Sequence, residues 1–327
     1  RNHIRNNDCR LSAGVGRIGM QINDSLTTDD WMEVYKKLVY WEIELEKAKF
    51  DDDMLRMQKQ EANNAFGKFV KKNYVDWIQH PEIRPLMSPD LFKKSIPDAD
   101  NGDKVFFILI DNFRLDQWRE SKSLLAEYYT FDESLYYSIL RPPHNMPQLD
   151  LLRADALADR KDVSGTWVDE DSEEGKLNEA PLIQTQIERF RKKYTFSYHK
   201  VHDSQYNDKL LNIVPSLLHN QLNVVVLNFV DMLSHARTEN KMIRELAQSE
   251  AAIAADTLLV PAFGHAGIFK RIAGKGYKVI VTTDHGTIRV DNPEKVIGDK
   301  NTNTNLRYKV GKNLNYNPKD VFDIRFP

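Results

Sequence analysis

Three runs of consecutive apolar residues stand out in the later part of the chain. They are KVFFILID at 104–111, NVVVLNFVD at 223–231 and KVIVTTD at 278–284. Near-continuous apolar runs of this length are typical of parallel strands whose sheet is covered by helices on both faces. Segments with helical periodicity separate them, for example at 181–194 and 268–272. This alternation predicts an α/β fold with a mostly parallel sheet and flanking helices.

The first third of the chain follows a different period. From Thr27 onward apolar residues recur at steps of three and four, as the buried stripe of a helix requires, and Thr27 is a residue type that caps helices. A second helical stretch begins near Asp53, and aromatic residues carry the pattern into a third that ends near His80. Prolines from Pro81 to Pro97 then mark the boundary of this all-helical region.

These changes of pattern predict three parts of the chain. Residues 1–25 are polar with little periodicity, and we interpret them as a linker or the end of a fragment. Residues 26–100 are expected to form a helical region, and residues 101–327 are expected to form the α/β domain.

The bulk composition indicates a soluble globular protein. Of the 327 residues, 41% are hydrophobic and 29% are charged. No apolar run approaches the roughly 18 residues of a membrane span, so no membrane partner is expected. The formal charge of -2 argues against binding nucleic acid through bulk electrostatics, because such binding depends on an excess of basic charge. A small nucleotide in a local site remains compatible with this charge.

Cys9 is the single cysteine of the sequence. One thiol excludes an internal disulfide framework and any zinc site built from several cysteines, and it suits a reducing compartment such as the cytoplasm. The opening RNHIRNNDCR lacks the apolar core of a secretory signal. A metal site in this chain would therefore use histidine and carboxylate ligands.

Each of the three predicted strands ends on an aspartate, at Asp111, Asp231 and Asp284. The carboxyl ends of parallel strands share one edge of a sheet, where α/β proteins bind their ligands. Three carboxylates gathered there would repel one another unless cations compensate their charge, and a divalent metal is the ordinary compensation. The sequence therefore predicts a metal site at this edge.

Two histidines accompany these aspartates. His235 follows Asp231 by four residues in DMLSH, which would place both on one side of a helical turn, and His285 directly follows Asp284 in DHG. Mixed histidine and carboxylate ligation suits Zn²⁺. Two such ions about 4 Å apart could hold the attacking and leaving oxygens of a phosphoryl transfer.

Each part of this pattern also has a simpler interpretation. An aspartate at the end of a strand is often a turn or helix cap, and the DxxxH spacing occurs often by chance. Arg114, three residues after Asp111, could contact a substrate phosphate through its guanidinium fork. A salt bridge from Arg114 to Asp116 or Glu120 is an equal alternative.

Four segments carry a resemblance to a known family: FFILIDNFRLDQW, NFVDMLSHARTE, VIVTTDHGTIRV and TNTNLRYKVGKNLNYNPKDVFDIR. They resemble the PglZ domain of the alkaline phosphatase superfamily, and most closely that of PorX-type response regulators of the Bacteroidetes. The resemblance runs from about Gly19 to the C-terminus. It implies that residues 26–100 are a helical signalling or linker domain and that residues 101–327 are an alkaline-phosphatase-like domain, C-terminally incomplete here.

The resemblance also implies a function and a ligand set. The function would be that of a zinc-dependent phosphodiesterase or phosphatase, acting on a phosphorylated small molecule or oligonucleotide such as a nucleotide signal. Asp111, Asp284 and His285 would bind one zinc, and Asp231 with His235 would bind the second. The implied setting is a cytoplasmic, homodimeric response regulator of type IX secretion, with a receiver domain, a histidine kinase and a sigma factor as partners.

The sequence departs from the family pattern at three points. Family members carry a threonine nucleophile after the segment that matches SLYYSIL, but RPPHNMP follows it here, so the sequence assigns no catalytic nucleophile. A third ligand of the second zinc is expected beyond Pro327, and no receiver domain precedes the helical region. The alternative is therefore a weakly active or inactive phosphatase-like scaffold that acts through protein-protein interaction. A sulfatase or phosphomutase relative is a further option.

Overall fold

The chain divides into two compact units. The first comprises residues 1–85 with the short segments 118–120 and 132–136, and the second comprises the rest. The fold is that of a computed structural model, which describes the following residues: 14–49, 53–96, 102–138, 179–201, 204–228, 230–231, 266–286, 293–302, 309–321 and 323.

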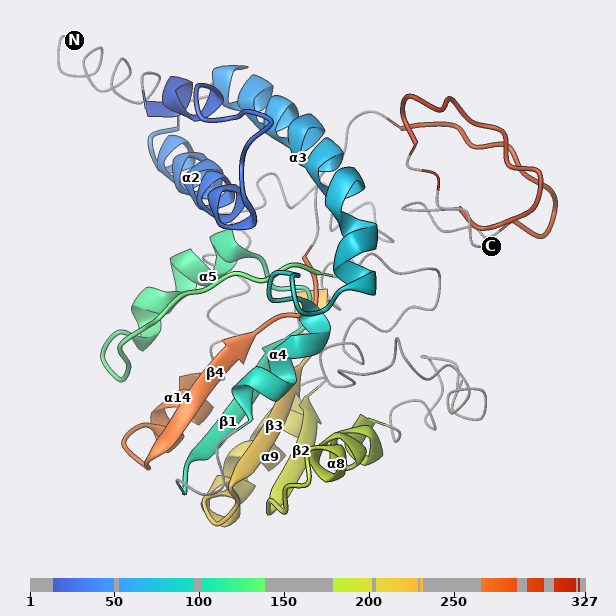
Figure 1. The fold of residues 1–327 in the computed structure, drawn as a ribbon. Coiled ribbons are helices and arrows are strands. Elements are labelled where there is room, and N and C mark those ends of the chain that lie inside the picture. Colours follow the sequence, from blue (N-terminus) through green and yellow to red (C-terminus); the bar gives the residue numbers. More distant parts are fainter. Residues whose placement is uncertain are drawn as a thin grey trace, which may run out of the picture. The chain divides into compact units, whose positions relative to one another are not determined.

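Two long helices, α2 (Thr28–Lys47) and α3 (Asp53–Gln79), dominate the first unit (Figure 1). Thr27 caps α2 as predicted, since its hydroxyl accepts from the backbone N–H of Asp30 while the Asp30 carboxylate accepts from the N–H of Thr27. The predicted break between a second and a third helix is wrong. The apolar and aromatic positions of α3 lie on one uninterrupted helix of 27 residues, which ends near the predicted boundary at His80.

The core of the first unit lies between these helices. Trp31 of α2 packs edge-on against Phe66 of α3 with ring centroids 5.3 Å apart. A short helical stretch at residues 14–19 adds the buried side chains of Val15 and Ile18 to the same cluster. The helical region therefore has a hydrophobic core of its own.

A four-stranded parallel sheet forms the centre of the second unit. Its strand order is β2-β3-β1-β4, where β1 is Lys104–Ile110, β2 is Phe196–Val201, β3 is Leu222–Leu227 and β4 is Tyr277–Thr282. Every residue of β3 is buried, and only the first residue of β1 is partly exposed. The near-continuous apolar runs predicted β1, β3 and β4. Burial on both faces explains the composition of β1 and β3. The expected burial is wrong for β4, an edge strand whose side chains are mostly partly exposed.

Helices cover both faces of this sheet. In Figure 1, α4 (Ser88–Ser95) and α8 (Glu179–Arg189) lie in front of it, and α9 (Ser204–Leu217) and α14 (Ala266–Ile272) lie behind. Phe92 of α4 packs edge-on against Phe107 of β1, with centroids 5.5 Å apart. The short helices α5 (Leu115–Ser121) and η2 (Lys122–Leu125) follow β1. The predicted α/β fold with flanking helices after a helical region is confirmed.

The edge strand β2 was not predicted from the sequence. Its residues, FSYHKV, mix apolar and polar side chains without a run of consecutive apolar residues, and all but the last are partly exposed. His199 lies in this strand. Burial lowers the pKa of the His199 imidazole, because a buried imidazolium loses its hydration.

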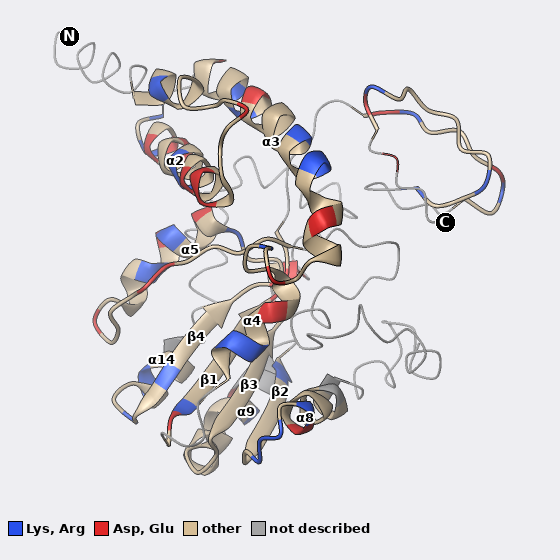
Figure 2. Cartoon of the chain, in the orientation of Figure 1, with Lys and Arg blue, Asp and Glu red and all other residues tan. Residues whose placement is uncertain are grey.

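Charged residues lie mostly on the helices (Figure 2). Both α2 and α3 carry acidic and basic side chains, whereas the middle of β1 and of β3 carries no charge. None of the helices in the described part of the chain is long and apolar enough to cross a membrane.

Candidate metal centre

The register of the sheet brings Asp111 and Asp284 to the same level on adjacent strands. Leu109 of β1 pairs with Thr282 of β4, and each aspartate lies two residues beyond that pair. On the other side of β1, Ile110 pairs with Leu227 of β3. Asp231 therefore lies farther past the end of its strand than the other two aspartates and reaches the site from the start of the following helical turn.

The turn after β1 is fixed by three successive backbone N–H groups. The N–H of Asp111 donates to the carbonyl of Leu227 at 2.9 Å. That of Asn112 donates to Asp284 Oδ1 at 3.2 Å, and that of Phe113 donates to the hydroxyl of Thr283 at 2.9 Å. The turn is thus tied to both neighbouring segments of the sheet, which sets the position of the Asp111 side chain.

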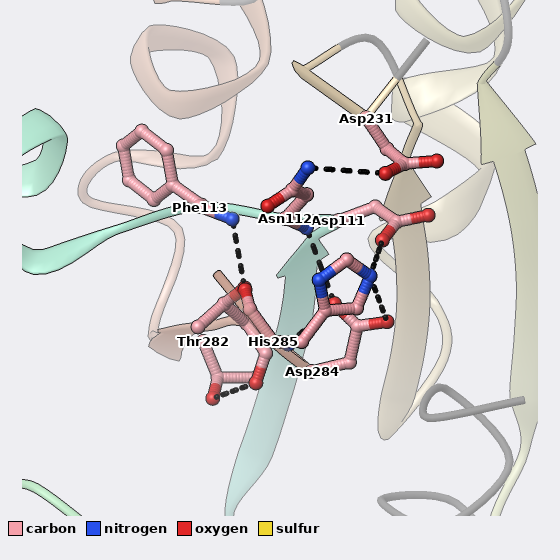
Figure 3. A network of polar contacts seen from close by, with 8 residues as sticks. Asp111, Asn112, Phe113, Asp231, Thr282, Asp284 and His285 are labelled. Atoms are coloured by element: carbon pink, nitrogen blue, oxygen red, sulfur yellow. Dashed lines mark hydrogen bonds and ion pairs between the residues drawn. The ribbon is translucent and has the colours of Figure 1, made fainter. Parts of the chain in front are cut away.

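Asp111, Asp284 and His285 form a compact group of potential metal ligands (Figure 3). One ligand atom from each lies within 4.8 Å of the others. His285 Nε2 is 3.4 Å from Asp111 Oδ1 and 3.8 Å from Asp284 Oδ2. Both aspartates are buried, while His285 is partly exposed, so the group opens to solvent on the histidine side.

The electrostatics of this group favour a cation. Burial, together with the neighbouring charge of Asp111, raises the pKa of Asp284 to about 7. Burial disfavours the imidazolium of His285, but the carboxylates of Asp111, Asp284 and Asp231 outweigh it and raise the pKa of His285. A positive charge among these carboxylates is therefore stabilised, whether it is carried by protons or by a metal ion.

The donor set fits a metal such as zinc. Asp284 Oδ1 accepts the N–H groups of Asn112 and His285, whereas its buried Oδ2 has no hydrogen-bond partner in the described part of the chain. A buried carboxylate oxygen without a donor is costly, and coordination would satisfy it. Two carboxylates and one imidazole match the ligand types that Zn²⁺ takes in catalytic sites.

Asp231 lies beside this group but is not one of its three members. Its Oδ1 accepts a hydrogen bond from Asn112 Nδ2 at 3.1 Å, which links it to the turn that carries Asp111. His235, predicted to bind a second metal with Asp231, lies outside the described residues, as do Cys9 and the segment RPPHNMP.

Arg114 forms a salt bridge with Asp116, which was one of the alternatives to phosphate binding. Its Nε and Nη2 donate to the two carboxylate oxygens of Asp116 at 2.9 Å and 2.8 Å. Its side chain also passes close to the turn of the DHG segment, since a Cβ added to Gly286 would lie 3.2 Å from Arg114 Cγ. Arg114 therefore lies near His285 with its guanidinium oriented by Asp116.

Sequence reasoning missed two residues of this site. Asn112 bridges Asp231 and Asp284, and Thr283 accepts from Phe113 and donates to the carbonyl of His285 at 2.7 Å. The only sequence signal for either residue was its place beside a predicted ligand.

Comparison with known proteins identifies both parts of the chain. No curated protein matches it. Residues 12–78 match the PorX response regulator linker domain, which indicates a link to two-component signalling. Residues 91–325 match the BREX system PglZ alkaline phosphatase-like domain, whose fold is typically metal-dependent. The predicted resemblance is confirmed, and with most of its length covered by that match the chain belongs to the PglZ alkaline-phosphatase-like family.

Proposed function

We propose that this chain is the effector part of a response regulator and that it hydrolyses a phosphate ester or phosphodiester with the help of zinc. The observation that carries the proposal is the group formed by Asp111, Asp284 and His285, whose ligand atoms lie within 4.8 Å of one another at the carboxyl edge of the sheet. The raised pKa of Asp284 supports it, because buried carboxylates placed this close need a compensating cation.

Each residue has an assigned role in this proposal. Asp111, Asp284 and His285 hold one zinc, and Asp231 with His235 holds a second. Two zinc ions at such positions would stabilise the attacking and leaving oxygens of phosphoryl transfer. Arg114 binds a phosphate oxygen of the substrate, which requires its guanidinium to share or exchange the contact with Asp116.

Metal analysis of the purified chain tests this function. We expect close to two equivalents of zinc in protein purified without chelator, and hydrolysis of bis-p-nitrophenyl phosphate that is lost on chelation and restored by added Zn²⁺. Asp284→Ala should lose zinc and activity together, since it removes an anionic ligand. Substoichiometric zinc with activity that survives chelation would exclude the proposal.

The biological setting is proposed on the match to the PorX response regulator linker domain. We infer a cytoplasmic regulator of type IX secretion that receives its signal through a receiver domain and a histidine kinase, acts as a homodimer and engages a sigma factor. Its substrate would be a nucleotide signal or short oligonucleotide. Hydrolysis of linear and cyclic dinucleotides, compared at equal concentration, tests the substrate class.

A second candidate is a phosphatase-like scaffold that acts through protein-protein interaction. The bidentate contact between Arg114 and Asp116 favours it, because that contact occupies the guanidinium otherwise available to a phosphate. Zinc at full stoichiometry without hydrolysis of any phosphodiester tested would support the scaffold. Measurable turnover that disappears in Asp284→Ala would exclude it.

A further inference from the structure

Asn112 contacts carboxylates from two other segments of the chain. Its backbone N–H donates to Asp284 Oδ1 at 3.2 Å, and its side-chain Nδ2 donates to Asp231 Oδ1 at 3.1 Å (Figure 3). We propose that Asn112 is a positioning residue, which aligns the Asp231 carboxylate with the group of Asp111, Asp284 and His285 and so completes the second zinc position. The inference rests on the proposed two-zinc function.

The backbone of Asn112 explains why it reaches both carboxylates. Its φ of 58° lies in the left-handed region, which asparagine tolerates better than most residues with a Cβ. Hydrogen bonds of the residues on either side, Asp111 to Leu227 and Phe113 to Thr283, hold it there. This conformation turns the backbone N–H toward Asp284 while the side chain extends toward Asp231.

The orientation of the amide follows from its partner. A carboxylate oxygen can only accept, so the amide atom that faces Asp231 Oδ1 is the nitrogen. The amide oxygen is then left buried, with Asn112 only 2% exposed and Oδ1 without a hydrogen-bond partner among the described residues. Glycine would adopt the same φ without burying an unsatisfied oxygen. The advantage of asparagine at this position is therefore its contact with Asp231.

Asn112 donates a hydrogen bond to one oxygen of Asp284 and to one oxygen of Asp231. On Asp284, Oδ1 accepts two backbone N–H groups and leaves Oδ2 near His285 Nε2. On Asp231, Oδ1 accepts the amide of Asn112. Asn112 thus contacts one oxygen of each carboxylate, and hydrogen bonds of this kind commonly fix the orientation of metal ligands.

Zinc titration of the chelator-treated protein tests this inference. Asn112→Gly keeps the left-handed backbone and the N–H to Asp284 but removes the side-chain amide. We expect one zinc to bind about 10- to 100-fold more weakly than in the unaltered chain, the range typical of losing such a partner, while the other binds unchanged. Asn313→Gly is the matched control, because Asn313 is exposed and also left-handed, with a φ of 56°.

A double-mutant cycle separates positioning from general damage. In an Asp231→Ala background a single zinc should bind, and adding Asn112→Gly should leave its affinity unchanged, because the amide has lost the group through which it acts. Asn112→Ala, which is strained at that φ but also lacks the amide, should reproduce the weaker binding of the second zinc.

The outcomes distinguish the two proposals. Two zinc ions bound with unchanged affinities in both Asn112 variants would overturn the positioning role and leave the proposed function intact. The positioning role would also be overturned if adding Asn112→Gly to Asp231→Ala weakened the binding of the remaining zinc. Fewer than two zinc ions in the unaltered chain would overturn the two-zinc function, and this inference with it.

Discussion

At the scale of single residues, Asp284 is a buried carboxyl whose pKa departs far from that of an exposed side chain. It is 4% exposed, lies beside Asp111 and has a pKa raised to about 7. Such a carboxyl binds its proton more tightly in the folded than in the unfolded chain. In zinc-free protein its contribution to stability therefore falls as pH rises from about 4, the unfolded pKa, to 7.

Asp284→Asn tests this titration without changing the shape of the side chain. Between pH 4 and pH 8 the zinc-free unaltered chain should lose on the order of 2 kcal/mol relative to the variant. His285 acts in the same direction, since its raised pKa stabilises the fold below its unfolded value of about 6.5 and that stability is lost at higher pH. Urea unfolding with chelator present measures the difference, and parallel pH profiles would contradict the assignment.

Gly286 provides a second test at this scale. A Cβ at this position would lie 3.2 Å from Arg114 Cγ, so alanine must displace the arginine stem by a few tenths of an ångström. If Arg114 binds the substrate phosphate, Gly286→Ala should raise the KM for a phosphodiester several-fold with zinc content unchanged.

Gly267→Ala is the control for that measurement. Gly267 lies on α14, away from the site. A Cβ at this position would lie 3.3 Å from Leu211 Cδ1, close to the 3.2 Å found at Gly286. Both substitutions should change the free energy of unfolding by no more than about 1 kcal/mol, and only Gly286→Ala should change KM. An equal effect of the two on KM would show that the response reflects packing alone.

The sequence predicted some residues of the candidate site and not others, for a physical reason. Asp111, Asp231 and Asp284 stood out because each ends an apolar run, and His285 because it follows one of them. Asn112 and Thr283 act through a left-handed backbone and a cross-strand hydrogen bond. Neither feature leaves a periodic trace in the sequence, so only the folded register reveals them.

At the scale of elements, the same reasoning explains which strands were predicted. Strands β1 and β3 are buried on both faces, which selects consecutive apolar residues that are readily recognised. Both edge strands, β2 and β4, have one sheet neighbour and mostly partly exposed side chains. Strand β4 was still predicted because Val279, Ile280 and Val281 are consecutive apolar residues, whereas β2 mixes apolar and polar residues and contains no such run. The predicted break between the second and third helices is wrong, because the aromatic residues of α3 follow one another without a helix cap or proline between them.

The link between β4 and the turn after β1 gives a prediction at this scale. Thr283 Oγ1 accepts from the N–H of Phe113 and donates to the carbonyl of His285. Thr283→Val keeps the shape but leaves that N–H without its acceptor, so we expect a loss of about 1–3 kcal/mol in the free energy of unfolding. Zinc affinity should fall as well, because the DHG turn loses its anchor.

Thr282→Val is the matched control one residue earlier. The Thr282 hydroxyl makes only a long contact of 3.4 Å with the carbonyl of Thr283, so its loss should cost well under 1 kcal/mol. Denaturant unfolding of both variants measures the difference. Equal destabilisation would mean that the cost comes from the strand and not from the hydrogen bond of Thr283.

At the scale of the whole molecule, the two compact units have separate cores and only one carries the candidate metal centre. The first unit is organised around the cluster of Trp31, Val34 and their neighbours, whereas Asp111, Asp284 and His285 belong to the second. A ligand stabilises the part that binds it, by RT ln(1 + [L]/Kd), or about 2.7 kcal/mol at a hundred times Kd. Zinc should therefore stabilise the second unit selectively.

This selectivity can be measured because the tryptophans are unevenly distributed. Trp31, Trp41, Trp77 and Trp118 belong to the first unit, so replacing Trp167 with phenylalanine makes the emission report that unit alone. Calorimetry should show a transition that moves up by several degrees with Zn²⁺, while the fluorescence midpoint stays in place. Asp284→Ala should abolish the calorimetric shift. A fluorescence midpoint that rises with zinc would instead show that the two units unfold in one cooperative transition. Zinc binding would then also stabilise the helices that match the response-regulator linker.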